Sequence, residues 1–102
     1  MKRRRVTSSA ILKDSSLSVF ERRVYEAVSG IPRGEVRSYA WVARMAGSPK
    51  ACRAVGNALN KNRYTDIIPC HRVIKSDGSI GGYARGTSAK RRMLKSEGVD
   101  GL

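Results

Sequence analysis

Two short helical segments separated by a tight break most constrain how this chain can fold. The apolar spacing predicts a helix over residues 39–46, which Gly47 ends. Ser48 and Pro49 then supply a cap residue and a first-turn proline, so a further helix is expected to begin there and to end between residues 60 and 62. Two helices joined by so short a turn form a helix-turn-helix, whose second helix enters a groove of DNA.

The segments on either side complete the predicted fold. Residues 18–21 carry the serine and glutamate of a capping box, and apolar residues at helical spacing follow them. A turn signal at residues 76–79 predicts that its flanking residues pair as a small β-hairpin. We therefore expect a mainly α fold with a small β-hairpin, a winged helix-turn-helix domain over residues 16–102. Residues 1–15 are expected to form a basic flexible tail.

A last helix is expected to follow the glycine-rich loop, with Thr87 or Ser88 as its cap and Gly98 as its end. Its apolar residues Met93 and Leu94 are expected to face inward. The basic residues of this helix are expected to face outward, into solvent: Lys90, Arg91, Arg92 and Lys95.

The charge of the chain points to a polyanionic partner. Lys and Arg number 21 against 8 acidic residues, a net charge of +13. Nucleic acid is the first such partner to consider, and solubility alone is the alternative. The apolar residues are too scattered for a membrane span, and with no signal peptide visible we expect a cytoplasmic, nucleoid-associated protein, or a nuclear one in a eukaryote. A single His and the lack of a Cys-x-x-Cys pair argue against a metal site.

Residues 68–73 place a thiol, an imidazole and a guanidinium side by side, at Cys70, His71 and Arg72. Pro69 restricts the backbone before them, so the cysteine is presented from a defined bend. A thiol is a weak nucleophile until it loses its proton, which a neighbouring base can take. The run resembles the active-site signature of the O6-alkylguanine-DNA alkyltransferases, a DNA-repair family that moves an alkyl group from a damaged guanine onto its own cysteine.

The resemblance extends over residues 17–99, because other positions of the family pattern match in order and spacing. Residues 36–39 look like the segment with the family's active-site tyrosine, and residues 50–56 look like the helix with its arginine finger. Three further matches lie 8 residues before, 13 after and 27 after the cysteine. The residues matched in this way, besides the cysteine and histidine, are Tyr39, Arg53, Asn62, Tyr83 and Glu97.

The resemblance implies a catalytic mechanism. Cys70 would attack the alkyl carbon, His71 would take the thiol proton through a water, and Glu97 would orient and stabilise the imidazole. Because the damaged base lies inside the duplex, it must be flipped out, and Arg53 would fill the space it leaves. Tyr39 would donate its hydroxyl to a ring nitrogen of guanine as negative charge develops there, and would also contact DNA.

The resemblance also implies supporting roles. Asn62 would brace the turn that links the DNA-binding helices to the active-site segment. Backbone groups near Val73 and Ala84 would recognise the edge of guanine, and Tyr83 would line the substrate pocket or touch DNA. Arg72 is expected to be structural rather than catalytic.

Simpler interpretations of the same residues stay open. Arg53 could contact a phosphate, Tyr39 could be a half-buried core tyrosine, and Glu97 could be a solvated acid in a last helical turn. His71 could be a core histidine that the backbone satisfies, and Asn62 could be a helix cap.

The helix that would enter the groove carries unusually small side chains. Ala51, Ala54 and Gly56 surround Arg53, its one long basic residue. Small residues let a helix backbone come close to DNA, as a narrow minor groove requires. The alternative is that they pack against a neighbouring helix. Cys52 is expected to be a small packing residue on the same stripe as Val55 and Leu59.

The length of the chain leaves two other functions open. Only about 16 residues precede the first helix, so we expect the C-terminal catalytic and DNA-binding domain alone, acting as a monomer on double-stranded DNA that contains O6-alkylguanine and using no cofactor. The alkyltransferase-like proteins are also short, bind alkylated guanine without transfer, and signal to other repair machinery, but usually lack the cysteine. A helix-turn-helix regulator with no chemistry is the third possibility.

Overall fold

The computed structural model describes residues 16–62, 64, 67–83 and 85–102, so the expected basic tail lies outside the described residues. These residues form a helix-turn-helix type of domain that is mainly helical, as the sequence predicts. None of the helices in these ranges has the length and apolar character needed to cross a membrane. The elements in chain order are α2 (Val19–Ser29), β1 (Arg37–Ser38), α3 (Tyr39–Met45), α4 (Cys52–Asn60), the 3₁₀ turn η1 (Cys70–Arg72), β2 (Val73–Ile74) and α5 (Thr87–Ser96).

Helix α2 begins with the predicted capping box. The Ser18 hydroxyl accepts the Glu21 N–H at 3.0 Å, and the Glu21 carboxylate accepts the Ser18 N–H at 2.9 Å. The helix buries Val24 and Val28 completely, and the Tyr25 hydroxyl donates to the Ala58 carbonyl of α4 at 2.8 Å. This buried hydrogen bond joins the first helix of the core to the helix expected to meet DNA.

The helix-turn-helix is present, but its second helix begins later than predicted. Gly47 ends α3 with a φ of 83°, a conformation that favours glycine. Ser48 and Pro49 do not start α4, because the Ser48 carbonyl accepts the N–H of Ala51 at 2.9 Å and closes a separate turn. Helix α4 therefore begins at Cys52. Its buried face consists of Val55, Ala58 and Leu59.

The predicted β-hairpin is wrong. β2 pairs instead with β1 in a parallel register that aligns Arg37 with Val73 and Ser38 with Ile74. Residues 75–79 still turn back on themselves through a hydrogen bond from the Lys75 N–H to the Ser79 carbonyl at 3.0 Å, but no second strand follows among the described residues. The partner of β2 lies about 36 residues earlier in the chain. Local turn signals cannot predict strand pairing over that separation. As a result, Tyr39, the first residue after β1, lies next to the segment that carries Cys70.

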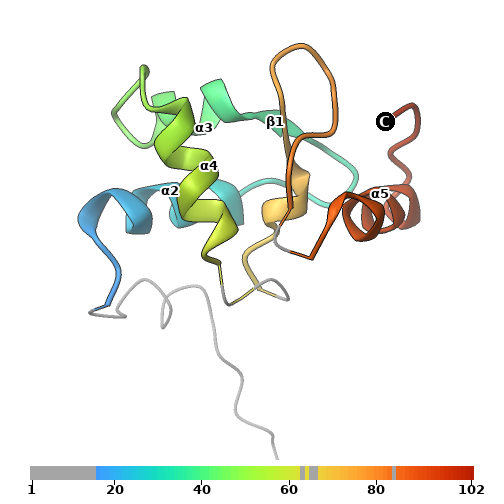
Figure 1. Ribbon diagram of the computed structural model, residues 1–102, viewed down its shortest axis with the longest axis horizontal. Helices are drawn as coiled ribbons and strands as arrows, with labels where there is room; N and C mark the ends of the chain where they lie inside the picture. The colour runs from blue at the N-terminus through green and yellow to red at the C-terminus, as the bar shows by residue number, and fades with distance from the viewer. Residues whose placement is uncertain (1–15, 63, 65–66, 84) are drawn as a thin grey trace, which may run out of the picture.

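Helix α5 lies on the opposite side of the molecule from the α2–α4 group, with β1 and the short turn η1 between them (Figure 1). Thr87 and Ser88 are not its caps. Its N-cap is Gly86, at a φ of 91°, with no side-chain capping bond in the described part of the chain. Leu94 is buried as predicted, but so is Lys90, which is 0% exposed. The expectation that Lys90 faces solvent is therefore wrong.

Candidate active site

Cys70 is presented from a tight bend, as the proline before it suggests. Its N–H donates to the Ile68 carbonyl at 2.8 Å, and the Pro69 carbonyl accepts the Arg72 N–H at 2.9 Å. The Cys70 side chain is buried, at 3% exposure. Burial raises the pKa of this thiol, while a side-chain hydrogen bond from Asn62 and the charge of Lys90 act in the opposite direction. The resting group is therefore a thiol, and it needs a base to become a nucleophile.

A buried ionic network lies directly beside the cysteine. The Glu97 carboxylate accepts two hydrogen bonds from Arg72, at 3.0 Å from Nε and 2.7 Å from Nη2, and lies 3.0 Å from Nε2 of His71. Arg72 also donates to the Ile31 carbonyl at 2.9 Å, which anchors it to the end of the first helical segment. These bonds to Arg72 lower the pKa of Glu97 to about 2, so the carboxylate is charged at neutral pH.

The network determines which nitrogen of His71 can act as a base. Burial lowers the pKa of His71, so the ring is neutral at pH 7. Because a charged Glu97 can only accept, Nε2 must carry the hydrogen of the neutral ring. The lone pair then resides on Nδ1, a buried atom with no hydrogen-bond partner among the described residues. The arrangement produces a neutral imidazole, oriented by a carboxylate, with one free basic nitrogen.

Asn62 connects the end of α4 to the cysteine segment. Its amide nitrogen donates to the Ile68 carbonyl at 3.1 Å, and its side-chain oxygen accepts the Tyr64 N–H at 2.8 Å. The Tyr64 carbonyl in turn accepts the N–H of Ile68 at 2.7 Å. The side chain is 6% exposed. The Asn62 side chain therefore joins the backbone of Tyr64 to that of Ile68.

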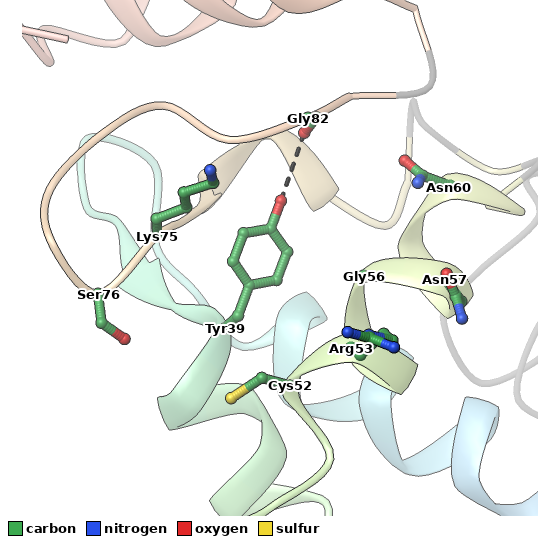
Figure 2. A pocket seen from close by; sticks show the side chains of 9 residues that line it. All are labelled: Tyr39, Cys52, Arg53, Gly56, Asn57, Asn60, Lys75, Ser76 and Gly82. Atoms are coloured by element: carbon green, nitrogen blue, oxygen red, sulfur yellow. Dashed lines mark hydrogen bonds between the residues drawn. The ribbon is translucent and has the colours of Figure 1, made fainter.

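A groove of about 650 Å³ runs between α4 and the loop that follows β2 (Figure 2). Arg53 lies on its α4 side, Lys75 lies on its loop side, and Tyr39 stands between them with its hydroxyl 3.4 Å from the Gly82 carbonyl. Burial, and then the nearby Cys70, raise the pKa of Tyr39, so its hydroxyl keeps a proton to donate. Cys70 does not line the groove itself.

Comparison with known proteins identifies the domain. The family described as 6-O-methylguanine DNA methyltransferase, DNA binding domain, matches residues 19–99 of this chain. The chain belongs to this family. The matched stretch holds both helices of the helix-turn-helix, the cysteine bend and the buried ionic network.

Relatives and solved structures agree with this family. The methylated-DNA–protein-cysteine methyltransferase of Methanothermobacter thermautotrophicus is 45% identical over 91 residues, which are 88% of this chain and 50% of that protein. Mycobacterium tuberculosis OGT, solved in complex with DNA, has a TM-score of 0.78 at 44% identity and covers 80% of this chain and 50% of that one. S. pombe Atl1, solved with damaged DNA containing O6-carboxymethylguanine, has a TM-score of 0.72 at 37% identity over 79% and 77% of the two chains. This chain spans about half the length of the curated relatives it matches.

The small residues around Arg53 are partly or fully exposed. Ala54 is exposed, and nothing lies within 4 Å of the position that a Cβ on Gly56 would take. Ala51 is half-buried at the start of the helix. Ala54 and Gly56 therefore do not pack against a neighbouring helix. Cys52 is exposed and lines the groove, so the expectation that it packs inward is wrong.

Two further residues that the resemblance names, Val73 and Tyr83, are buried. Val73 is fully buried in β2. Tyr83 is 9% exposed, its ring centroid is 6.4 Å from that of His71, and its hydroxyl donates to the Met93 sulfur at 3.3 Å. It is absent from the described lining of the groove and packs against the histidine instead. Ala84 lies outside the described residues.

One buried residue beside the site, Lys90, was not predicted from the sequence. Its ammonium group donates to the Val73 carbonyl at 2.6 Å and to the Gly82 carbonyl at 3.0 Å. One signal was available, because Lys90 stands four residues before Leu94 and so shares its inward face of α5.

Proposed function

We propose that this protein repairs DNA directly, by moving the alkyl group of an O6-alkylguanine in double-stranded DNA onto Cys70 in a single turnover. The observation that carries this proposal is the buried cysteine next to a neutral histidine that a charged carboxylate orients. A protein that only bound DNA would have no use for this nucleophile, base and orienter. Genomic DNA is the substrate, so the site of action would be the nucleoid or a nucleus.

The proposed transfer step assigns a part to each of these groups. The Cys70 proton passes to Nδ1 of His71, through a water, while Glu97 stabilises the imidazolium that forms. The sulfur forms a bond to the alkyl carbon, and the carbon–oxygen bond breaks with its electron pair on the guanine oxygen. Tyr39 donates a hydrogen bond to a ring nitrogen of the leaving base. Guanine takes up one proton overall, which balances the proton that the thiol lost. The thioether is not reversed, so each molecule acts once.

The helix-turn-helix would deliver the base to this site. The exposed small residues of α4 let the helix backbone approach a minor groove closely, and Arg53 projects from it to fill the space of the flipped base. The net charge of +13 supports binding to the phosphate backbone. The groove has a cation on each side, Arg53 and Lys75, and we propose that one monomer occupies one lesion in this way.

Lesion binding without transfer is the second candidate. It is favoured by the likeness to S. pombe Atl1, a protein solved with O6-carboxymethylguanine DNA, of which this chain covers 77%. Against it stand Cys70 and the basic nitrogen of His71, which a pure lesion sensor does not need.

Intact mass spectrometry separates the two candidates. The protein is incubated with duplex DNA that contains one O6-methylguanine, and its mass is compared with that after incubation with undamaged duplex. The addition of one methyl group, mapped by peptide digestion to Cys70, is expected. Selective binding to the damaged duplex with no change in mass would instead make the protein a lesion sensor.

Arg53→Ala is expected to weaken binding to the damaged duplex by about 10- to 100-fold. The variant cannot donate a charge-assisted hydrogen bond inside the space that the flipped base leaves, and losing such a bond costs about 1.5–3 kcal/mol. Binding to undamaged duplex should fall by less than about threefold, the effect of one exposed charge. Fluorescence anisotropy with both duplexes measures the two losses. Arg92→Ala removes the same charge from the exposed surface of α5 and serves as the control. Equal losses on both duplexes would make Arg53 a simple phosphate contact.

A further inference from the structure

Asn57 lies on the exposed face of α4, one helical turn after Arg53. Arg53, Asn57 and Asn60 have the i, i+4, i+7 spacing that places side chains on one face of a helix, and all three line the groove (Figure 2). Both asparagines are exposed, and neither side chain forms a hydrogen bond in the part of the chain that the structure describes. Two amide groups with unused donors and acceptors therefore face the place where the proposed substrate would bind.

An asparagine inside this helix has a cost for the fold. Asparagine is a poorer helix former than alanine, because its short amide competes for backbone hydrogen bonds. Asn60 is the last residue of α4, where this matters little, but Asn57 lies within the helix. Since the Asn57 amide has no hydrogen bond to another described residue that would offset this cost, we look for its role outside the fold.

The helix leaves Asn57 free to reach the bases. No atom lies within 4 Å of the position that a Cβ on the neighbouring Gly56 would take, so no side chain of the described residues shields the amide on that side. A rise of about 1.5 Å per residue separates Asn57 from Arg53 by about 6 Å along the helix axis, and stacked base pairs are about 3.4 Å apart. With Arg53 in the space of the flipped base, Asn57 would meet a base pair within about two steps of the lesion.

The minor-groove edges of the base pairs differ by one hydrogen-bonding group. Every pair offers acceptors there, and only a G·C pair adds a donor, the N2 amino group of guanine. A carboxamide carries both an acceptor oxygen and a donor amino group. Asn57 can therefore donate to N3 of guanine and accept from its N2 amino group, whereas adenine offers N3 alone.

We propose that Asn57 reads the minor-groove edge of a base pair beside the lesion and selects guanine there over adenine. This inference rests on the proposed function and deepens it, because it gives the substrate a sequence context. Arg53 recognises the gap that the flipped base leaves, and Asn57 recognises the pairs that stay stacked next to it.

Lesion duplexes that differ only in the purines beside the lesion test this proposal. The Cys70→Ser protein is used, so that transfer does not consume the single O6-methylguanine. The purines at the two neighbouring positions on each side are guanine, inosine (guanine without its amino group), adenine or 2,6-diaminopurine (adenine with that group added). Fluorescence anisotropy should show binding about fivefold tighter when the amino group is present, the effect of about one neutral hydrogen bond.

Asn57→Ala in the same protein removes the amide and should abolish this fivefold preference. The ratio of the two proteins' preferences is the quantity to report, because it cancels the effect of the flanking pairs on the cost of flipping the base. Asn60→Ala is the matched control, since it removes the same exposed amide from the end of the same helix. It should keep the preference.

The pattern over the four duplexes separates base reading from other roles. An equal loss of affinity on all of them would make Asn57 a contact to the DNA backbone and overturn the proposal. A preference that is absent from the parent protein, survives Asn57→Ala or disappears in Asn60→Ala would also overturn it. Urea unfolding should show Asn57→Ala at least as stable as its parent, because alanine is the better helix former, and a clear loss of stability would assign Asn57 to the fold instead.

Failure of the proposed function appears in a different measurement. It would be an unaltered mass of the wild-type protein after incubation with O6-methylguanine DNA. A lesion sensor that transfers nothing would still show the preference for an amino group beside the lesion, so the two results are independent.

Discussion

Cys70→Ser will bind O6-methylguanine DNA as well as the wild-type protein does, but its mass will not increase. A serine hydroxyl occupies nearly the same volume as the thiol but stays protonated at neutral pH, and the neutral His71 cannot remove its proton effectively. We expect a loss of transfer beyond the limit of intact mass measurement, with a lesion affinity within about threefold of wild type.

The control for this experiment is Cys52→Ser, because Cys52 is the more accessible thiol and lines the groove next to Arg53. This variant keeps Cys70 and its ionic network, so it is expected to gain the methyl group. Methylation of Cys52 in the Cys70→Ser protein would show that exposure, rather than the neighbouring base, selects the acceptor. It would contradict the proposed mechanism.

Glu97→Gln will reduce both stability and transfer. The substitution leaves Arg72 without its charged partner in a network whose side chains are only 15% and 6% exposed, and breaking a buried pair in this way costs about 3–5 kcal/mol. Without the carboxylate, His71 also loses the group that orients it and stabilises its protonated form, so the transfer rate should fall about 100-fold or more. Urea unfolding and single-turnover methylation measure the two effects.

Glu35→Gln is the matched control for this substitution. Glu35 pairs with Arg37 at 2.7 Å, but the two side chains are 50% and 33% exposed, so the change should cost less than about 1 kcal/mol and leave transfer intact. A Glu97→Gln protein as stable and active as this control would show that the buried network plays no part in either property.

The pairing of Glu97 with Arg72 predicts how the stability of the protein depends on pH. Folding lowers the pKa of Glu97 from 4.5 to about 2, so the folded state binds fewer protons than the unfolded state between these values. The contribution of Glu97 to stability is therefore complete above about pH 4.5 and is lost as the pH falls towards 2. Urea midpoints measured down this range should decline in the wild-type protein and decline less in Glu97→Gln.

The sequence by itself determined the features that depend on neighbouring residues. The capping box at residues 18–21 and the glycine at position 47 specify their local geometry through side-chain and backbone hydrogen bonds within a few residues. They therefore predicted α2 and the end of α3 correctly. The bend at Pro69 and Cys70 is equally local. The resemblance of the cysteine run to a known family named candidate site residues. Three of them, His71, Tyr83 and Glu97, lie together in the structure.

Only the tertiary structure decided which distant segments meet. The parallel pairing of β1 with β2 replaced the predicted hairpin, because an edge of two residues is satisfied by whichever segment the surrounding helices bring to it. The same packing turned Lys90 inward onto the Val73 and Gly82 carbonyls, although its residue type predicts a solvated position. No local sequence pattern predicts which residues are buried or which distant segments are in contact. The environment of Cys70 therefore follows from the fold, whereas its presence follows from the sequence.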